Sequence, residues 1–397
     1  MISVQEVYES NFKVGAYSFF EDLRKNQPIH ALSEQNGNTT WIVTQYEDVL
    51  KLLKQPSFIK DQSKLFSNAQ SDDDPMEAKI FQNMMLDADP PDHRRLRKLV
   101  QPHFNPKTIK QLEPRIQDIA DELIFQMSEK REDIDLINDF AFPLPIIVIS
   151  ELLGVPIEDR DKFRQWSNTI VSAADGEEGD FTRDIGEFID YLKELFAERE
   201  RNPQEDLISN LLQTRDEGDL LNDEELYSMI VLLIIAGHET TVNLIGNGML
   251  ALFEHPDQLN LLKEDLSLTE QAIEESLRYY SPVDFSTARW AEDDLELHDQ
   301  TIKRGDLVLG SISSANRDDK QFHHAEVFDI QRKPNPHIAF GYGIHFCLGA
   351  PLARLEAKIA FKSLLTAFPN ISLNQMSKPE WRQVFLLRGL NQLKVNL

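Results

Sequence analysis

The stretch that decides the fold reads Phe340-Gly341-Tyr342-Gly343-Ile344-His345-Phe346-Cys347-Leu348-Gly349, and it holds the only cysteine of the chain. Glycines permit a positive φ and let a flat ligand approach the backbone closely. A helical pattern begins directly after Gly349, and a thiol near a helix N-terminus is biased toward the thiolate by the helix dipole. Such a thiolate is a good axial ligand for haem iron. The competing interpretation is a small buried hydrophobic residue in a turn.

The composition narrows the classes of protein that fit. One cysteine among 397 residues cannot form an intrachain disulfide or an all-cysteine metal site. The net charge of −26, from 41 Lys and Arg against 67 Asp and Glu, argues against nucleic acid, because phosphate binding needs a basic face. The N-terminus lacks a signal pattern, and the longest apolar run, Ile230 to Ala236 with a weak extension to Leu226, is too short to span a membrane. We therefore expect a cytoplasmic protein without a membrane anchor.

The spacing of apolar residues predicts a mainly α protein with a small β-rich part. Helical spacing dominates about 90–280 and returns over about 350–368. The β-rich parts are expected at three places: about 28–60, 283–335 and 370–397. No internal repeat or flexible linker is visible, so a single domain is expected over 1–397.

Two segments of the helical part carry more specific expectations. The longest helix is expected from Asp223 to Glu254, with Asn222 as its N-cap and Glu225 as the capping-box partner. About 32 residues at about 1.5 Å each would span about 48 Å, so this helix should pass through the core. The polar segment 61–80, which contains an acidic run, is expected to be a solvated loop.

Inside that longest helix lies the hexapeptide Ala236-Gly237-His238-Glu239-Thr240-Thr241. A glycine in a helix is unfavourable by about 1 kcal/mol, but it opens space beside the backbone and lets the helix bend. An acid next to a hydroxyl can relay protons from water into a dry pocket. The competing interpretation is a wet polar stripe on a helix. We expect His238 to be structural or solvent-facing.

These features resemble the cytochrome P450 family, whose haem-binding loop has the pattern FGxGxHxCxG. Residues 340–349 of this chain match that pattern. The sequence is most similar to the soluble bacterial three-component type, and the resemblance covers nearly the whole chain. It implies the P450 fold with a long central helix over the haem. It also implies that Cys347 ligates the iron of haem b, that Thr240 holds the distal oxygen and that Glu239 links to solvent. The cofactor contacts implied in the cysteine loop are Phe340, Gly341 and Gly349.

The two carboxylates of haem need cationic or hydrogen-bonding partners when they are buried. His93 and Arg97 are spaced i,i+4 on one expected helix face, and the family places such a pair on one propionate. Arg289 and His345 match the partners of the other propionate. The competing interpretations are a solvated basic helix over 93–98 and a surface ion pair for Arg289.

An ExxR pattern at Glu275 and Arg278 places both side chains on one helix face. Alone it is a weak signal, since surface pairs of this kind contribute little. The resemblance implies a buried Glu275–Arg278–Arg332 cluster behind the cysteine loop. One departure from the family pattern is a proline replaced near His324, which should weaken a turn and not the site.

Basic residues gather locally in spite of the overall acidity. They are Arg94, Arg95, Arg97 and Lys98 with His93, and Arg354 and Lys358 after the cysteine loop. The resemblance places them on the face where an electron donor docks, which predicts a ferredoxin or flavodoxin and its reductase, supplied by NAD(P)H. A monomer is expected.

The segments that the resemblance places near the substrate are apolar around the haem. Their members are Leu233, Ile235, Ala236, Val283, Phe285, Leu386 and Leu387. They favour a hydrophobic substrate such as a fatty acid, a terpenoid or a steroid, while Asp284 and Arg388 could face the pocket or solvent.

We therefore expect a haem-thiolate monooxygenase that uses O₂. One alternative is a peroxygenase driven by H₂O₂, against which the intact Glu239–Thr240 pair argues, since a peroxide route needs no dioxygen protonation. The other alternative is a non-catalytic haem or ligand-binding protein, which nothing in the sequence supports.

Overall fold

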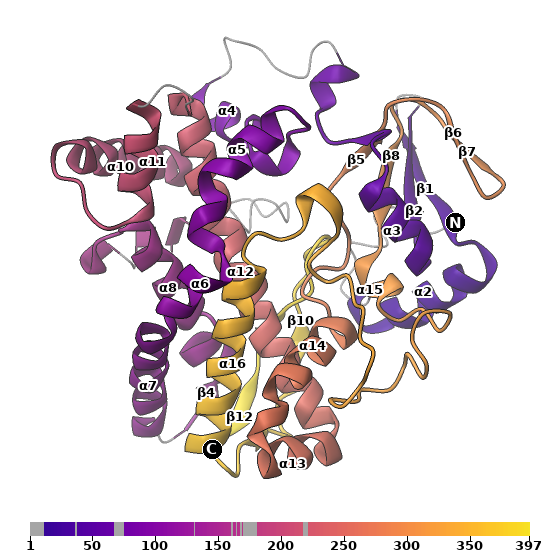
Figure 1. The fold of residues 1–397 in the computed structure, drawn as a ribbon. Helices are drawn as coiled ribbons and strands as arrows, with labels where there is room; N and C mark the ends of the chain where they lie inside the picture. The colour runs from indigo at the N-terminus through magenta and orange to yellow at the C-terminus, as the bar shows by residue number, and fades with distance from the viewer. Residues whose placement is uncertain are drawn as a thin grey trace. The chain divides into compact units, whose positions relative to one another are not determined.

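The computed structural model describes residues 12–35, 38–66, 75–130, 132–159, 162–163, 165–166, 169, 181–216 and 221–397. Figure 1 shows a mostly helical chain with small sheets, which confirms the predicted fold class. The chain divides into two compact units. Unit one comprises Met1–Ile59, Arg115–Phe142 and Thr240–Leu397, and unit two comprises Lys60–Pro114 and Pro143–Glu239. The expected single domain stays a prediction.

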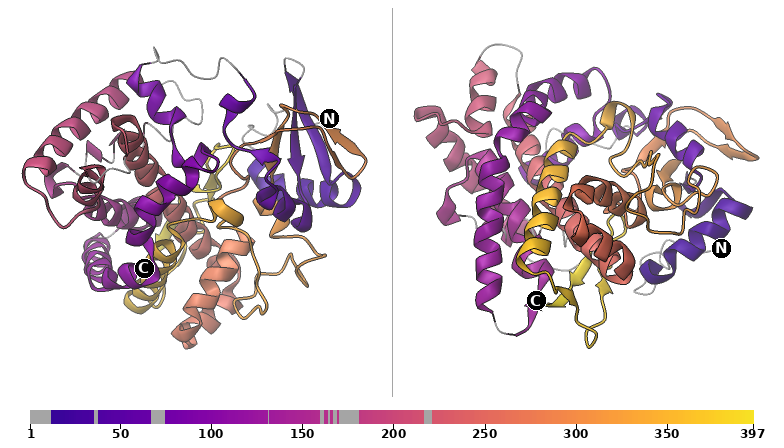
Figure 2. Two further views of the ribbon diagram at one scale, coloured as in Figure 1. Left: turned by 45° about the horizontal axis from the view of Figure 1, so that its top comes forward. Right: turned by 60° about the horizontal axis from the view of Figure 1, so that its bottom comes forward.

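The main sheet of unit one has five strands in the order β1-β2-β8-β5-β3. Their bounds are β1 (Ile29–Gln35), β2 (Asn38–Val43), β3 (Phe58–Ile59), β5 (Arg289–Ala291) and β8 (Leu307–Gly310). Strands β2 and β8 are parallel, and the other neighbours are antiparallel. The left view of Figure 2 shows β1 and β2, in indigo, side by side.

Alternating side chains of the main sheet enter two different hydrophobic clusters, because successive residues of a strand point to opposite faces. Trp41 and Val43 of β2 join one cluster, together with α3 (Tyr46–Lys54). Ile42, between them, joins the other cluster with Phe20 of α2 (Phe12–Asn26). The sheet is therefore buried on both faces, and its central strands are fixed in register.

The remaining elements of unit one are helices and three small sheets. The helices are α7 (Glu113–Glu129), α13 (Pro256–Glu264), α14 (Thr269–Tyr279), α15 (Ile312–Ala315) and α16 (Ala350–Ala367). The small sheets are β4-β12-β9 (Ile134–Asp135, Lys394–Asn396, Ser372–Leu373), β6-β7 (Leu295–Leu297, Gln300–Ile302) and β10-β11 (Glu380–Trp381, Leu390–Gln392). Helices α14 and α16 pack against each other, as Figure 1 shows.

Unit two is helical. Its α-helices are α4 (Met76–Gln82), α5 (Asp92–Val100), α6 (Pro106–Gln111), α8 (Pro143–Leu153), α10 (Phe181–Arg201) and α11 (Leu207–Asp216). Helix α10 packs on α4 and α11, and α11 also contacts α5 and α8. The prediction of a loop over 61–80 is wrong from Met76 onward, because Pro75 starts α4 there and Ile80 is fully buried. The acidic run at Asp72–Asp74 lies outside the described residues.

Helix α12 (Asp223–Glu254) has the predicted bounds, and the division between the units falls within it, after Glu239. The predicted capping box is confirmed. The Glu225 N–H donates to Asn222 Oδ1 at 2.8 Å, and the Asn222 N–H donates to Glu225 Oε2 at 3.0 Å. Among the described residues this helix alone is long and apolar enough to cross a membrane, but 78% of its most apolar window is buried within the protein. That burial is typical of a core helix.

Candidate functional site

The loop that carries Cys347 is closed by its own backbone and depends on glycine. The Cys347 N–H donates to the Phe340 carbonyl at 2.9 Å, so the loop between them returns on itself before α16 begins. Gly341 and Gly343 have φ of +70° and +77°, a region that side chains with Cβ rarely adopt. A Cβ on Gly343 would also lie 3.0 Å from the Leu53 carbonyl oxygen. Both positions therefore require glycine.

The Cys347 side chain is exposed, so the competing interpretation of a small buried hydrophobic residue is wrong. The apolar side chains beside it are also accessible: Tyr342, Ile344 and Phe346 are 44%, 45% and 40% exposed. A thiol flanked in sequence by accessible apolar side chains on a glycine loop is suited to a flat apolar ligand with a soft metal. This donor set fits haem iron.

Glu274 of α14 holds the segments on both sides of the cysteine loop. Its carboxylate accepts from Arg354 of α16 at 2.6 and 2.8 Å and lies 2.9 Å from His337 Nε2. Burial alone would raise the pKa of Glu274, but Arg354 and His337 together lower it to about 2. The Arg354 guanidinium also lies 4.5 Å from the Phe340 ring centre. One carboxylate thus fixes both ends of the loop.

The predicted Glu275–Arg278–Arg332 cluster is confirmed. Arg278 donates to both oxygens of Glu275 at 2.8 and 2.7 Å, and Arg332 Nε lies 3.1 Å from each of them. Arg278 also donates to the carbonyls of Asn316, Ala325 and Val327. Every guanidinium of the cluster is therefore anchored to a carboxylate and to backbone carbonyls.

The turn at His324, where the resemblance implies a replaced proline, is held by Arg332 of the same cluster. His324 has φ of +50°, which is uncommon for a residue with a Cβ. Arg332 donates to the His323 carbonyl at 2.6 Å and to the His324 carbonyl at 2.9 Å. Hydrogen bonds from a charged group fix the turn without proline.

The residues predicted for the haem propionates fall in both units. In unit one, Arg289 of β5 is 5% exposed with its Nη1 3.5 Å from the Phe58 carbonyl, and His345 is half-buried. In unit two, His93 is 2% exposed and Arg97 is half-buried, one turn apart in α5. The solvated-helix interpretation is wrong for His93, because its side chain is buried. The propionate roles stay predictions.

The hexapeptide of α12 contains closely packed, buried and half-buried residues. A Cβ on Gly237 would lie 3.1 Å from the Ile149 side chain, so glycine lets α8 approach. His238 is fully buried, with Nδ1 2.7 Å from the Ile234 carbonyl, which makes it structural and not solvent-facing. Glu239 is 3% exposed, whereas Thr240 is half-buried. The relay assigned to Glu239 and Thr240 stays a prediction.

Several buried ionisable side chains were missed from the sequence, and Glu356 and Lys13 are two of them. Glu356 of α16 is 1% exposed, and burial raises its pKa well above the usual value, while the Thr241 hydroxyl acts in the opposite direction. Lys13 of α2 is 3% exposed. Each lies at helical spacing among apolar residues, such as Leu352 and Ile359 around Glu356, and that spacing is the signal that could have revealed them.

The structure settles the position of Asp284 and Arg388. They are 0% and 1% exposed, and Arg388 Nε donates to Asp284 Oδ1 at 3.0 Å. Lys13 Nζ lies 2.5 Å from Asp284 Oδ2. Burial would raise the pKa of Asp284, but Arg388 and Lys13 lower it to about 2. Neither residue faces solvent.

Arg95, Arg354 and Lys358, three of the seven basic residues expected at a docking face, are paired with acids. Arg95 forms an ion pair with Glu225, and Lys358 lies 2.6 Å from Glu270. Arg354 pairs with Glu274, as described above. Arg94 and Lys98 of α5 are exposed and form no ion pair within the part of the chain that the structure describes.

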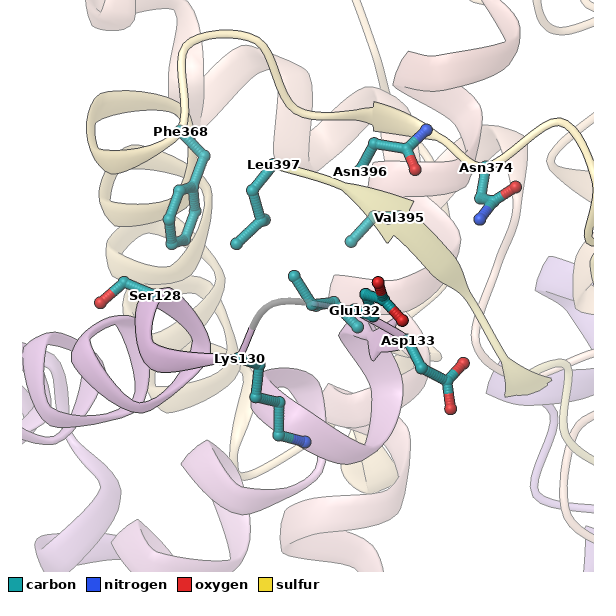
Figure 3. A pocket seen from close by; sticks show the side chains of 10 residues that line it. Ser128, Lys130, Glu132, Asp133, Phe368, Asn374, Val395, Asn396 and Leu397 are labelled. Atoms are coloured by element: carbon teal, nitrogen blue, oxygen red, sulfur yellow. The ribbon is translucent and has the colours of Figure 1, made fainter.

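A surface pocket of about 530 Å³, seen in Figure 3, lies near the C-terminal residue of the chain. Its lining is Ser128, Lys130, Glu132, Asp133, Ile134, Phe368, Asn374, Val395, Asn396 and Leu397. None of these residues belongs to the predicted site, so the pocket is not a candidate for the haem or its substrate.

Comparison with known proteins decides the family. The sequence model described as "Cytochrome P450" matches residues 7–395. The chain belongs to the cytochrome P450 family. A protein named "Cytochrome P450" from Bacillus subtilis (strain 168) is 48% identical over 389 residues, covering 97% of this chain and 95% of that protein.

Two solved structures of P450 enzymes are similar throughout. The bacillaene polyketide synthase cytochrome P450 PksS of Bacillus subtilis 168 has a TM-score of 0.92 at 41% identity, covering 98% of this chain and 99% of that one. P450BioI, in complex with an acyl carrier protein ligated to hexadec-9Z-enoic acid, has a TM-score of 0.89 at 38% identity, covering 98% and 100%. The chain is therefore a P450 monooxygenase with the P450 fold, and its family implies haem iron.

Proposed function

We propose that this P450 is a haem-thiolate monooxygenase that inserts one oxygen atom of O₂ into a C–H bond of a hydrophobic small molecule and reduces the other to water. The observation that carries the proposal is the exposed Cys347 thiol in a glycine-bounded loop at the start of α16. When bound, the haem supplies the binding and activation of O₂, which no side chain provides.

The chain's own residues would hold the cofactor. Cys347 would be the iron ligand, and its backbone N–H is already committed to the Phe340 carbonyl, which fixes the loop. The two propionates are assigned to buried or half-buried cations and imidazoles, because a buried carboxylate needs such partners. They are Arg289 and His345 for one propionate, and His93 and Arg97 for the other; Phe340, Gly341 and Gly349 would contact the ring.

Glu239 and Thr240 would deliver protons on the substrate side of the haem. Glu239 is buried in α12, and the half-buried Thr240 follows it directly in the chain. A hydroxyl can accept a hydrogen bond from water and donate one onward, while the carboxyl group exchanges protons with it. This pair favours the O₂-dependent reaction over an H₂O₂-driven peroxygenase.

The substrate is proposed to be apolar, with a fatty acid, a terpenoid or a steroid-like compound as the classes to test. Val283 and Leu387 are half-buried, and Leu386 is 37% exposed, so these side chains offer apolar surface. The similar P450BioI is in complex with an acyl carrier protein that bears a fatty acid, so a long-chain acyl compound is the first probe to use.

Electrons are proposed to come from NAD(P)H through a reductase and a ferredoxin or flavodoxin. The protein is proposed to act in the cytoplasm as a monomer. The exposed cations Arg94 and Lys98 are the candidates for docking an acidic carrier, because opposite charges steer association.

A panel of apolar compounds tests the function. Hexadec-9Z-enoic acid, a steroid and a terpenoid alcohol are each titrated against the haem-loaded protein, with the spin-state shift and the products as readouts. We expect oxygenated product with NAD(P)H and a donor pair, and loss of most of that product in Thr240→Ala. Equal turnover of Thr240→Ala and wild type with H₂O₂ alone would indicate a peroxygenase, and haem binding without any product would indicate a ligand-binding protein.

A further inference from the structure

A buried polar centre joins the first described helix to two loops that lie far away in the sequence. It consists of Lys13, Asp284, Ser313 and Arg388 and is called the Lys13 centre below. The side chains of Lys13, Asp284 and Arg388 are 3%, 1% and 1% exposed. Asp284 accepts hydrogen bonds from all three other members. Arg388 also donates to the Lys13 carbonyl at 3.0 Å, which closes the centre.

Lys13 has its full set of hydrogen-bond acceptors. Its Nζ contacts Asp284 Oδ2 at 2.5 Å, the Leu387 carbonyl at 2.8 Å and the Phe385 carbonyl at 3.2 Å. An ammonium group has three donors, so none is left over. A buried ion pair contributes little net stability compared with apolar packing, so the distinctive contribution of the Lys13 centre is the fixed geometry it imposes.

The Lys13 centre carries two cations and one anion. The Arg388 guanidinium lies 4.7 Å from the ring centres of both Tyr17 and Trp381, and aromatic faces attract such a cation. The excess positive charge has a consequence for mutants. Removing Lys13 leaves a balanced Asp284–Arg388 pair, whereas removing the charge of Asp284 leaves two buried cations.

The centre fixes two loops against each other. The Asp284 N–H donates to the Leu386 carbonyl at 2.8 Å, and the Arg388 N–H donates to the Pro282 carbonyl at 2.9 Å. The rings of Phe285 and Phe385 stack with centres 4.6 Å apart at 11°. Because Lys13 holds the carbonyls on either side of Leu386, its ammonium group determines where that residue lies.

The same loops present an apolar surface. Val283 and Leu387 are paired by an isolated β-bridge and are half-buried, and Leu386 between the two held carbonyls is 37% exposed. Accessible apolar side chains on a backbone that buried charges hold in place are suited to shape-specific contact with an apolar ligand.

We propose that the Lys13 centre positions Val283, Leu386 and Leu387 for contact with the substrate, so that Lys13 is a positioning residue for substrate selection. This inference rests on the proposed function, because it takes the apolar surface to be part of the substrate site. It gives the N-terminal helix α2 a part in selectivity that its place in the sequence does not suggest.

The test compares haem-loaded Lys13→Met with Lys25→Met. Lys25 lies on the same helix and forms an exposed ion pair with Glu21, so it is a matched control outside the centre. Hydrogen exchange of the amides in 385–388 reports the position of the loop. Spin-state titration with free hexadec-9Z-enoic acid reports the apolar contact, and titration with imidazole reports access to the iron alone.

We expect Lys13→Met to speed exchange in 385–388 and to weaken fatty-acid binding about tenfold or more, because one apolar contact in a hydrophobic pocket is worth about 10–200-fold. Imidazole binding should stay within about twofold of wild type, and Lys25→Met should change neither readout. Ser313→Ala, which removes one hydrogen bond to Asp284, should give a smaller change in the same direction. It replaces Lys13→Met as the test variant if Lys13→Met does not retain haem.

Unchanged exchange and unchanged fatty-acid binding in Lys13→Met, with only a lower thermal midpoint, would overturn the proposal and leave the centre a stabilising feature. If wild type shows no spin-state shift with any apolar probe, the proposed substrate class fails. In that case faster exchange in 385–388 still supports the positioning role, and unchanged exchange overturns it.

Discussion

Arg278 donates two hydrogen bonds to the carboxylate of Glu275, at 2.8 and 2.7 Å, and neither side chain has exposed surface. Glu275 also accepts from the Asn335 amide at 3.2 Å, and Asn335 precedes the cysteine loop. The pair therefore connects α14 to the chain that leads to Cys347. Its loss should be felt in the fold and in haem binding together.

We expect Glu275→Gln to lower the free energy of unfolding by about 3–5 kcal/mol, because it leaves buried guanidinium groups without a counter-charge. Urea unfolding and the haem content of the purified protein are the measurements. Glu270→Gln is the control, since Glu270 forms an exposed pair with Lys358 and should cost about 0–1 kcal/mol. A similar loss of unfolding free energy in both variants would show that the Glu275 cluster does not anchor the cysteine loop to α14.

Replacement of Glu356 by Gln should stabilise the protein at high pH. The folded pKa is raised above the unfolded value of 4.5, so the wild type loses stability as the pH rises from about 4.5 toward the folded pKa. Glu356→Gln does not titrate and avoids this loss. The thermal midpoint of the variant should exceed that of wild type at pH 8, and the difference should shrink toward pH 4.

The pKa of Glu274 is shifted in the opposite direction to that of Glu356, so its effect on stability depends on pH in the opposite way. Its folded pKa is about 2, below the unfolded 4.5, so its contribution is present above pH 4.5 and is lost as the pH falls toward 2. Glu274→Gln should therefore be less stable than wild type at pH 8. A pH-independent difference for either variant would contradict the assigned direction of the pKa.

Gly343→Ala should destabilise the cysteine loop by about 1–2 kcal/mol, because a Cβ is unfavourable at this φ. The Cβ would also press on the Leu53 carbonyl, 3.0 Å away. Gly186→Ala is the opposite case, since Gly186 lies in α10 with open space around it and should gain about 0.5–1 kcal/mol. Haem content and thermal midpoint are the readouts, and a gain for both variants would contradict the loop geometry.

Exchanging Arg94 and Lys98 for Glu should slow reduction by an acidic ferredoxin or flavodoxin while leaving substrate affinity unchanged. The effect should be largest at low salt, because ions screen the attraction between exposed charges. Stopped-flow reduction at two ionic strengths measures it. Arg95 is unsuitable for this purpose, because a carboxylate there would face Glu225 and disturb the packing of α5. Equal reduction rates of the variant and wild type at low salt would show that Arg94 and Lys98 do not belong to the docking surface.

The sequence was sufficient where a local pattern carries its own physical reason. The glycines around Cys347 and the capping box of Asn222 and Glu225 appear as predicted. The Glu275–Arg278–Arg332 cluster is also present, but it was predicted from the family resemblance and not from local spacing. Helix α4 was missed because its burial depends on tertiary contacts at Ile80, and the segment around it is polar.

The ion-pair partners of the buried charges were beyond the sequence for a related reason. Lys13 lies 271 residues from Asp284 along the chain, so no local spacing links them. The basic residues after the cysteine loop looked free in sequence, yet Arg354 and Lys358 pair with acids of α14. Only the packing of α14 on α16 brings these partners together.

The central claim is that Cys347 is the thiolate ligand of haem iron, and the absorption spectrum of the ferrous–CO complex tests it most directly. Wild type should absorb at the red-shifted position typical of thiolate ligation. Cys347→Ala should lack this band, and Cys347→His, if it retains haem, should absorb at the shorter wavelength of a nitrogen ligand. A red-shifted band that survives in Cys347→Ala, or is absent from haem-loaded wild type, would contradict the claim.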